Sequence, residues 1–200
     1  MSYITNEEIA EVERKFGDPV HLATTIDMTP LEIKRLRDSQ HGGRAHDITV
    51  FIFKGNKLLF NAKHFYPKGL YRAPSGAAKP GEGIEAGALR EAYEETGAKI
   101  QMERFLALIK VRFVNHLAHG DYIDWTSYVF KARYLSGKIE PIDKHEIRET
   151  RLVGFDEVPR FNEIMQKVNI GGFRYRVFLT KHIMKILEQD IVTANEMQSQ

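Results

Sequence analysis

The sequence of 200 residues contains no cysteine, and this absence excludes disulfide bonds, thiolate zinc sites and cysteine nucleophiles. It also lacks an apolar run that approaches the roughly 20 residues a membrane-spanning helix needs. The first 17 residues alternate charged and apolar side chains, which is not the pattern of a secretory signal. We therefore expect a cytoplasmic globular protein with no membrane partner.

An excess of charge of either sign is missing too. The chain has 29 Lys and Arg against 27 Asp and Glu, which leaves a formal net charge of +2. Such a balance does not favour a nucleic-acid partner. Hydrophobic residues make up 42% of the chain, which is enough for one core in a chain of single-domain length.

Two capping signals mark the N-terminal part of the chain. Thr5 with Glu8, and Thr29 with Glu32, have the three-residue spacing of a capping box, in which side chain and backbone groups bond reciprocally. Apolar residues follow each box at helical spacing. We expect a helical N-terminal extension over residues 1–45.

From residue 46 onward, β-branched and aromatic runs predict strands, and periodic apolar runs predict helices. The expected strands cover residues 48–53, 57–61, 105–114, 122–135 and 150–155. The expected helices cover residues 84–96, 158–167 and 173–189. This order predicts an α/β (α+β) fold in which a mixed sheet lies between helices, as one domain over residues 46–192 with a loose tail over 193–200.

Three glutamates share one face of the helix expected over residues 84–96. Glu94 and Glu95 lie three and four residues after Glu91, so the three carboxylates fall within one turn. Like charges at this spacing repel, and a hard cation such as Mg²⁺ or Mn²⁺ would relieve that repulsion through carboxylate oxygens. The alternative is a solvated acidic face. Arg90 can hold a carboxylate in a bidentate fork, and the preceding Gly/Pro loop allows close backbone approach, so both favour the cation site.

The segment 76–98 resembles the signature of the Nudix hydrolase family: Gly, five residues, Glu, seven residues, Arg-Glu, an apolar residue, any residue, Glu-Glu, any residue, Gly and an apolar residue. The residues that fill it are Gly76, Glu82, Arg90, Glu91, Ala92, Glu94, Glu95, Gly97 and Ala98. The likeness extends over about residues 46–160 and includes an acidic late segment with Glu146 and Glu149. In the entry to the signature, Ser75 stands where the family has a glycine.

The resemblance implies metal-dependent hydrolysis of a diphosphate linkage in a nucleoside diphosphate joined to another moiety, by attack of water on phosphorus. It implies a Nudix-type α/β/α sandwich, with Mg²⁺ or Mn²⁺ as cofactor. The implied metal-site residues are Glu82, Glu91, Glu94, Glu95 and the Ser75 carbonyl. The implied catalytic residues are Glu91, Arg90 and Glu149, with Glu146 as the alternative to Glu149.

Substrate contacts are less defined. Tyr71, Arg72 and Arg112 are candidates for binding the base or the phosphates, and the alternative is a core aromatic with two solvated charges. In the family resemblance, members that cleave ADP-ribose have a proline that would fall near Phe113 or Val114, and neither residue is a proline.

Two rival functions share the fold. A non-catalytic nucleotide-binding module usually loses signature acids, and this chain keeps them. An isopentenyl-diphosphate isomerase relies on a cysteine, which is absent. Three roles stay open for the N-terminal helices: a homodimer contact, a lid over the pocket, or simple packing on the sheet.

Overall fold

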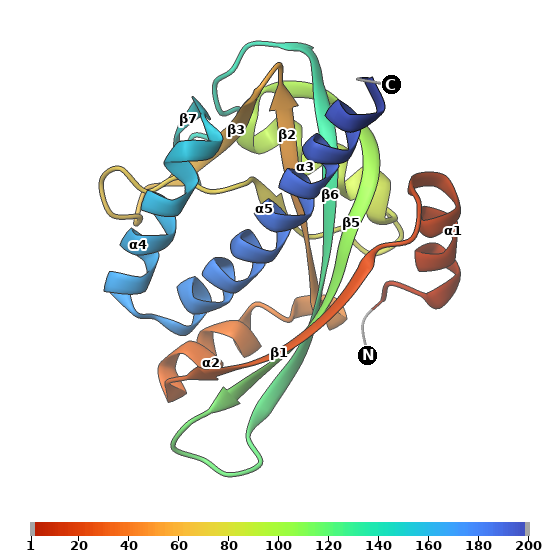
Figure 1. The fold of residues 1–200 in the computed structure, drawn as a ribbon. Coiled ribbons are helices and arrows are strands. Elements are labelled where there is room, and N and C mark those ends of the chain that lie inside the picture. Colours follow the sequence, from red (N-terminus) through yellow and green to blue (C-terminus); the bar gives the residue numbers. More distant parts are fainter. Residues whose placement is uncertain (1–2, 199–200) are drawn as a thin grey trace.

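In the computed structural model, which describes residues 3–198, one mixed sheet lies between two layers of helices (Figure 1). The strand order is β1–β5–β6–β2–β3–β7, and the short β4 pairs with β2. The β1–β5 and β2–β6 pairs are parallel and the remaining pairs are antiparallel. The predicted α/β (α+β) class and the three-layer α/β/α arrangement are confirmed.

The strands are β1 (Val20–Met28), β2 (His46–Lys54), β3 (Lys57–Lys63), β4 (Ser75–Gly76), β5 (Ala98–Asn115), β6 (Tyr122–Gly137) and β7 (Ile147–Val153). The helices are α1 (Asn6–Phe16), α2 (Pro30–Asp38), α3 (Ile84–Thr96), α4 (Val158–Val168) and α5 (Gly171–Gln198), with short 3-10 turns η1 (His41–Gly43) and η2 (Phe155–Glu157).

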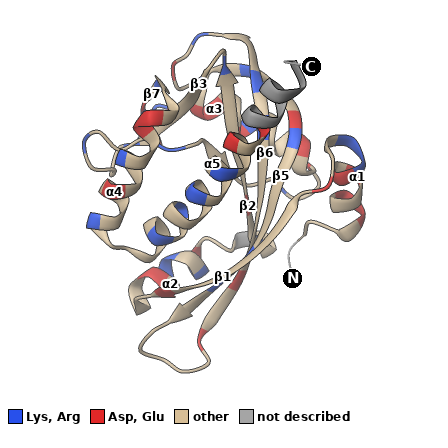
Figure 2. Ribbon diagram, in the orientation of Figure 1, with Lys and Arg blue, Asp and Glu red and all other residues tan. Residues whose placement is uncertain are grey.

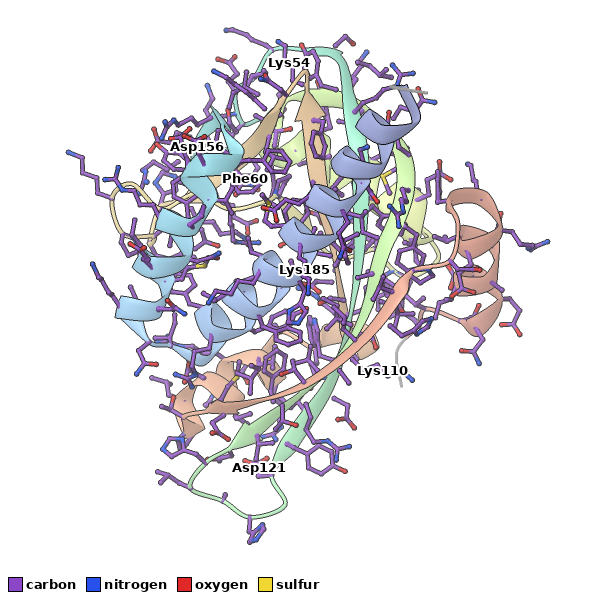
Figure 3. All side chains as sticks on the ribbon, viewed as in Figure 1. Lys54, Phe60, Lys110, Asp121, Asp156 and Lys185 are labelled. Atoms are coloured by element: carbon purple, nitrogen blue, oxygen red, sulfur yellow. The ribbon has the colours of Figure 1, made fainter. Side chains whose placement is uncertain are left out.

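The two faces of the sheet carry separate apolar clusters, because successive strand residues point to opposite faces. On β2, Phe51 belongs to the cluster that α2, α4 and α5 cover, and Phe60 of β3 points into the same layer (Figure 3). Ile48 and Val50 belong to the cluster under α1 and α3, where they meet Ile84. The sheet therefore has helices on both faces, and α3 is fixed against the second cluster.

The local signals in the sequence located several elements closely. Both predicted capping boxes are present, at Thr5 in front of α1 and at Thr29 in front of α2. Helix α3 spans the predicted residues 84–96 and ends where Gly97 takes the left-handed conformation at φ 69°. The acidic signature therefore lies on a helix whose two ends were predictable.

Three expectations need correction. The N-terminal 45 residues are not helical throughout, because β1 lies between α1 and α2 and pairs with β5. β1 is an edge strand whose side chains are mostly exposed or half-buried, so its hydrophobic alternation is weak. β5 begins at Ala98, earlier than predicted, and α5 continues to Gln198, beyond the helix end expected at residue 189. The last helical stretch contains no glycine or proline to end the helix, and residues 199–200 lie outside the described part.

Within residues 3–198, no helix is both long and apolar enough to cross a bilayer.

Candidate active site

The loop before α3 is pinned to the sheet by β4, whose residues Ser75 and Gly76 pair with β2. This pairing sets the backbone of Gly76 directly against the carboxylate of Glu91. A Cβ atom at Gly76 would lie 1.9 Å from the Glu91 Cδ atom and 2.0 Å and 2.4 Å from its two oxygens. Only glycine leaves room for a carboxylate there, so the sequence signature produces a backbone cradle for one acid.

Arg90 organises the acids on the outer side of this cradle. Its Nε and Nη2 atoms donate to the two oxygens of Glu82 at 2.6 and 2.9 Å, a bidentate fork. Nη1 donates to both Glu91 and Glu94 at 2.8 Å, and Nη2 also reaches the Ala77 carbonyl at 2.8 Å. The bond from Arg90 lowers the pKa of Glu82, and the same bond raises the pKa of Arg90. One guanidinium therefore fixes three carboxylates and the loop.

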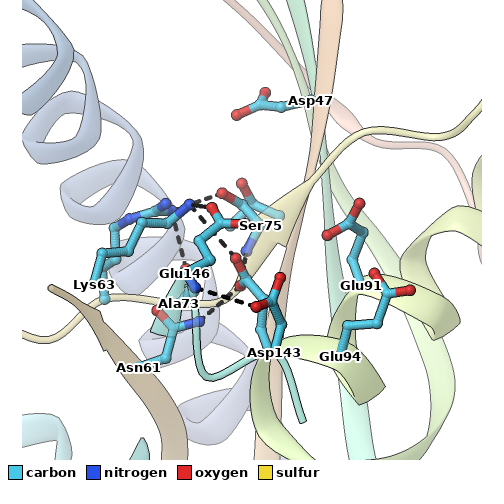
Figure 4. A network of polar contacts seen from close by, with 12 residues as sticks. Asp47, Asn61, Lys63, Ala73, Ser75, Glu91, Glu94, Asp143 and Glu146 are labelled. Atoms are coloured by element: carbon cyan, nitrogen blue, oxygen red, sulfur yellow. Dashed lines mark hydrogen bonds and ion pairs between the residues drawn. The ribbon is translucent and has the colours of Figure 1, made fainter. Parts of the chain in front are cut away.

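Glu95 occupies the inner side and is only 2% exposed. Its Oε2 atom accepts hydrogen bonds from the Asn61 side chain at 2.7 Å and the Ser75 amide at 2.8 Å. Its Oε1 atom has no hydrogen-bond partner among the described residues and lies 3.6 Å from the Lys63 ammonium. Lys63 also bonds Glu146. Burial raises the pKa of Glu95. Figure 4 shows Lys63 and Glu146 on one side of Ser75, and Glu91 and Glu94 on the other.

A second buried ion pair adjoins Ser75. Arg176 of α5 donates to Asp47 at 2.5 Å and to the hydroxyl oxygens of Thr49 and Ser75 at 3.0 and 3.1 Å. Burial acts to raise the pKa of Asp47, but Arg176 and the bond from Ser127 outweigh it, so the pKa lies below its usual value. Arg176 thereby links helix α5 to β2 and to Ser75 beside the acidic cluster.

Two of the residues predicted to contact substrate lie inside the protein. Arg72 is 6% exposed and donates to the hydroxyls of Ser75, at 2.6 Å, and Tyr66. Tyr71 is buried against Phe161, with ring centroids 5.7 Å apart. Arg72 therefore fixes the Ser75 side chain through a hydrogen bond and is not exposed to solvent for contact with a substrate phosphate.

Arg112, the third of these residues, lies in a different place. It is exposed on β5, pairs with Asp124 at 2.8 Å and stacks over the Tyr122 ring at 4.2 Å. It lines a hollow of about 780 Å³ together with Trp125 and Lys110. Within residues 3–198, the hydrogen bonds and ion pairs of Arg112 go to Asp124 and none goes to the acids of α3, so the structure does not bring Arg112 to the acidic cluster.

The two late acids separate in the structure. Glu146 reaches the cluster through Lys63, and its charge acts on Glu95. Glu149 is exposed on β7, pairs with Arg148 at 3.1 Å and bonds the Tyr71 hydroxyl. Of the two alternatives for the late acid, Glu146 is therefore the one that contacts the cluster.

The donors suit a hard cation, because the Glu91 carboxylate has its glycine cradle and the buried Glu95 keeps an unbonded oxygen. As they stand, no three acidic, histidine or cysteine side chains within residues 3–198 converge as a metal site. Arg90 holds Glu91 and Glu94, while Lys63 faces Glu95. The charge that a cation would supply is now supplied by these two side chains.

Sequence reasoning missed Asn61, Lys63, Asp47 and Arg176. Asn61 offered a signal, since a fully buried amide in an apolar strand demands a partner. Arg176 offered none, because it lies 129 residues from Asp47 along the chain.

The sequence profile of the NUDIX domain matches residues 43–170. A protein named NAD-capped RNA hydrolase NudC from Stutzerimonas stutzeri is 29% identical over 134 residues, 67% of this chain and 44% of that protein. One of the same name from Mannheimia succiniciproducens is 31% identical over 122 residues, 58% of this chain and 42% of that protein. The matched part therefore spans less than half the length of these relatives.

Solved structures share the fold. A UDP-X diphosphatase superposes with a TM-score of 0.53 at 17% identity, covering 78% of this chain and 71% of its own. A NUDIX hydrolase from Nitrosomonas europaea gives 0.51 at 23% identity, covering 70% and 69%. At these identities the likeness concerns the fold alone.

Proposed function

Because the chain belongs to the NUDIX domain family, we propose that it hydrolyses a diphosphate linkage in a nucleoside diphosphate joined to another moiety, with Mg²⁺ or Mn²⁺ as cofactor. The observation that carries this proposal is the cradle at Gly76, where the absence of a side chain leaves the Glu91 carboxylate directly against the backbone. Glu94 and Glu95 follow on the same turn of α3. A solvated acidic face does not require a glycine under one of its carboxylates.

The residues that would hold the cation are Glu91, Glu94, Glu95 and the Ser75 carbonyl. When bound, the cation neutralises the diphosphate and lowers the pKa of a water molecule. Glu82 is engaged by both nitrogen positions of the Arg90 fork, so its proposed role is to orient Arg90 and not to bind metal directly.

The reaction requires a water oxygen to bond phosphorus while the bridging P–O bond breaks. The proton released by that water passes to a carboxylate oxygen, for which we propose Glu91. Glu91 is partly exposed, so it reaches solvent and substrate from its cradle. Glu149 stays an alternative base from the sequence, and Glu146 is the alternative that the contacts favour. The products are a nucleoside monophosphate and the other phosphoryl half.

The substrate class is proposed from the chemistry of the site. NAD, which the names of two relatives mention, contains a diphosphate between two nucleosides and is one member of that class. The balanced charge of the chain favours a small molecule over a nucleic acid, so free NAD and NAD-capped RNA belong in the same comparison.

The test is a substrate panel with Mg²⁺ or Mn²⁺: nucleotide sugars, ADP-ribose, NAD, NAD-capped RNA, dinucleoside polyphosphates, nucleoside triphosphates and isopentenyl diphosphate. We expect turnover of at least one diphosphate-linked nucleoside, with ¹⁸O from labelled water found in a phosphate product. Turnover of isopentenyl diphosphate alone would favour the isomerase. Inactivity across the panel, with the fold intact and metal bound, would favour the binding module.

A matched pair of variants assigns any activity to the site. Glu91→Gln should lose at least about 100-fold in kcat, because misplacing or removing one group at the reacting centre costs that much. Glu85→Gln is the control, since Glu85 lies on the same helix but pairs outward with Lys15 at 2.6 Å. Equal turnover in the two variants would contradict the assignment of Glu91.

A further inference from the structure

The two edges of the sheet differ in how they are protected. β7 at one edge carries Arg148, Glu149 and Arg151, and its pairing with β3 has a register shift. Charged side chains and irregular pairing are the usual devices that stop an edge strand from pairing with another chain. β7 therefore has the features of an edge that stays single.

β1 at the other edge has only one acidic side chain, Asp27, and no irregular pairing. Its nine residues contain no lysine, arginine or proline, and all nine are in unbroken parallel register with β5. Within residues 3–198, no strand pairs with the outer side of β1. The ribbon of β1 is almost free of charged positions along its length (Figure 2). A regular, nearly uncharged edge of this length is a template for another strand.

The sequence of β1 is complementary to itself when read in the opposite direction. In an antiparallel pairing centred on Thr24, the facing residues are Val20 with Met28, His21 with Asp27, Leu22 with Ile26, and Ala23 with Thr25. The pairs of Val20 with Met28 and of Leu22 with Ile26 are apolar, and the only acid of β1 faces its only histidine. Such cross-strand pairs are the units that stabilise a sheet.

The faces match as well. Leu22 and Ile26 are half-buried and pack against the cluster beneath α5, so a pairing through them would continue that core into the second copy. At the C-terminal end, Arg174 of α5 donates to the Asp27 carbonyl, so this end of the backbone is already engaged. The stretch from Leu22 to Ile26, centred on Thr24, remains for pairing.

We propose that β1 pairs antiparallel with β1 of a second copy of this chain, with Thr24 on the two-fold axis. The two sheets then form one continuous sheet. Because the same patch is used by both copies, the interface is closed and stops at a dimer. The hollow beside Arg112 is lined by Ala23 and Thr25, so the two hollows would open next to this axis.

The absence of native cysteine allows a direct test of this register. Facing residues in an antiparallel pair have Cα atoms about 4.5 or 5.5 Å apart, depending on the type of pair. Both values fall within the range of about 4.4–6.8 Å that a disulfide spans. Residue 24 would therefore lie opposite its own copy, while residue 22 would lie four residues, or about 13 Å, from its copy.

We expect the unmodified protein to be a dimer by light scattering at tens of micromolar. Under mild oxidation, Thr24→Cys should link covalently, Leu22→Cys and Ile26→Cys alone should not, and a mixture of these two should link. A monomer at every concentration would overturn the proposal. So would a dimer that links poorly at residue 24, or one in which Thr24→Cys and Leu22→Cys link equally.

A pair of charge variants tests the axis without a covalent bond. Thr24→Lys and Thr24→Glu place like charges face to face, so each should shift toward monomer, and mixing them should restore a mixed dimer. The same two substitutions at Gln166, on the exposed side of α4, are the controls and should leave the dimer unchanged. Dimers that tolerate both charges at residue 24 would place the interface elsewhere.

Discussion

Replacing Gly76 by alanine tests the cradle with a single added carbon. The new Cβ atom would lie 1.9 Å from the Glu91 Cδ atom, whereas non-bonded carbons settle near about 3.5 Å. The Glu91 carboxylate must therefore retreat by about 1.5 Å. The backbone can stay, because the atoms in the way are the far end of a flexible side chain.

Two effects of different size follow from that shift. Glu91 would lose its 2.8 Å bond from Arg90, but it is partly exposed and can find water, so we expect a stability loss of about 1 kcal/mol. The acid would, however, be displaced by more than 1 Å from its working position, and such a displacement costs about 100-fold in rate. Gly76→Ala should therefore keep its fold and lose most activity.

The assay measures kcat on the best substrate of the panel and the urea midpoint of the same preparation. Gly172→Ala is the control, because a Cβ atom at Gly172 meets nothing within 4 Å. Turnover of Gly76→Ala within about threefold of the unmodified protein would refute the cradle. A collapse of stability would show that Gly76 serves the fold and not the acid.

Two further predictions concern buried groups outside the acidic turn. Arg176→Met leaves Asp47 buried without its counter-ion and should cost about 3–5 kcal/mol in urea unfolding, whereas Arg176→Met with Asp47→Asn should recover much of that loss; additive losses would contradict the pairing. His46 is fully buried, and burial lowers its pKa to about 4. The pKa of His46 in the unfolded chain is near 6.5, so between pH 4 and 6.5 the unfolded chain binds more protons than the folded one. The contribution of neutral His46 to stability is therefore complete above pH 6.5 and declines as the pH falls through that window. Between pH 7.5 and pH 4, the free energy of unfolding should fall by about 3 kcal/mol less in His46→Phe than in the unmodified protein. An unchanged pH dependence would contradict the lowered pKa of His46.

The predictable parts of this protein are those encoded by neighbours in sequence. The capping boxes at Thr29 and Thr5, and the end of α3 at Gly97, involve groups a few residues apart, so their spacing alone located them. The acids of α3 were predictable for the same reason. The order of the expected elements predicted a mixed sheet between helices, and the family resemblance implied the same three-layer arrangement.

The unpredicted parts depend on pairs that are distant in sequence. β1 was missed because an edge strand needs no strong apolar alternation, and its partner β5 begins about 70 residues later. Arg72 had the sequence signal of an exposed charge, yet the fold buries it under Ser75. No spacing rule states which arginine will be enclosed, because that depends on what Tyr66 and Ser75 offer once the chain has folded.

The ion pair between Arg176 and Asp47 also bears on how the protein is made. During synthesis, β2 and α3 leave the ribosome before α5 does. The growing chain therefore contains Asp47 before its counter-ion Arg176 has been made. Burying an unpaired carboxylate is unfavourable, so the face of the nascent sheet that carries Asp47 would stay accessible to water. Helix α5 would then be the element that allows the interior to close, and the site would form only after Arg176 has been synthesised.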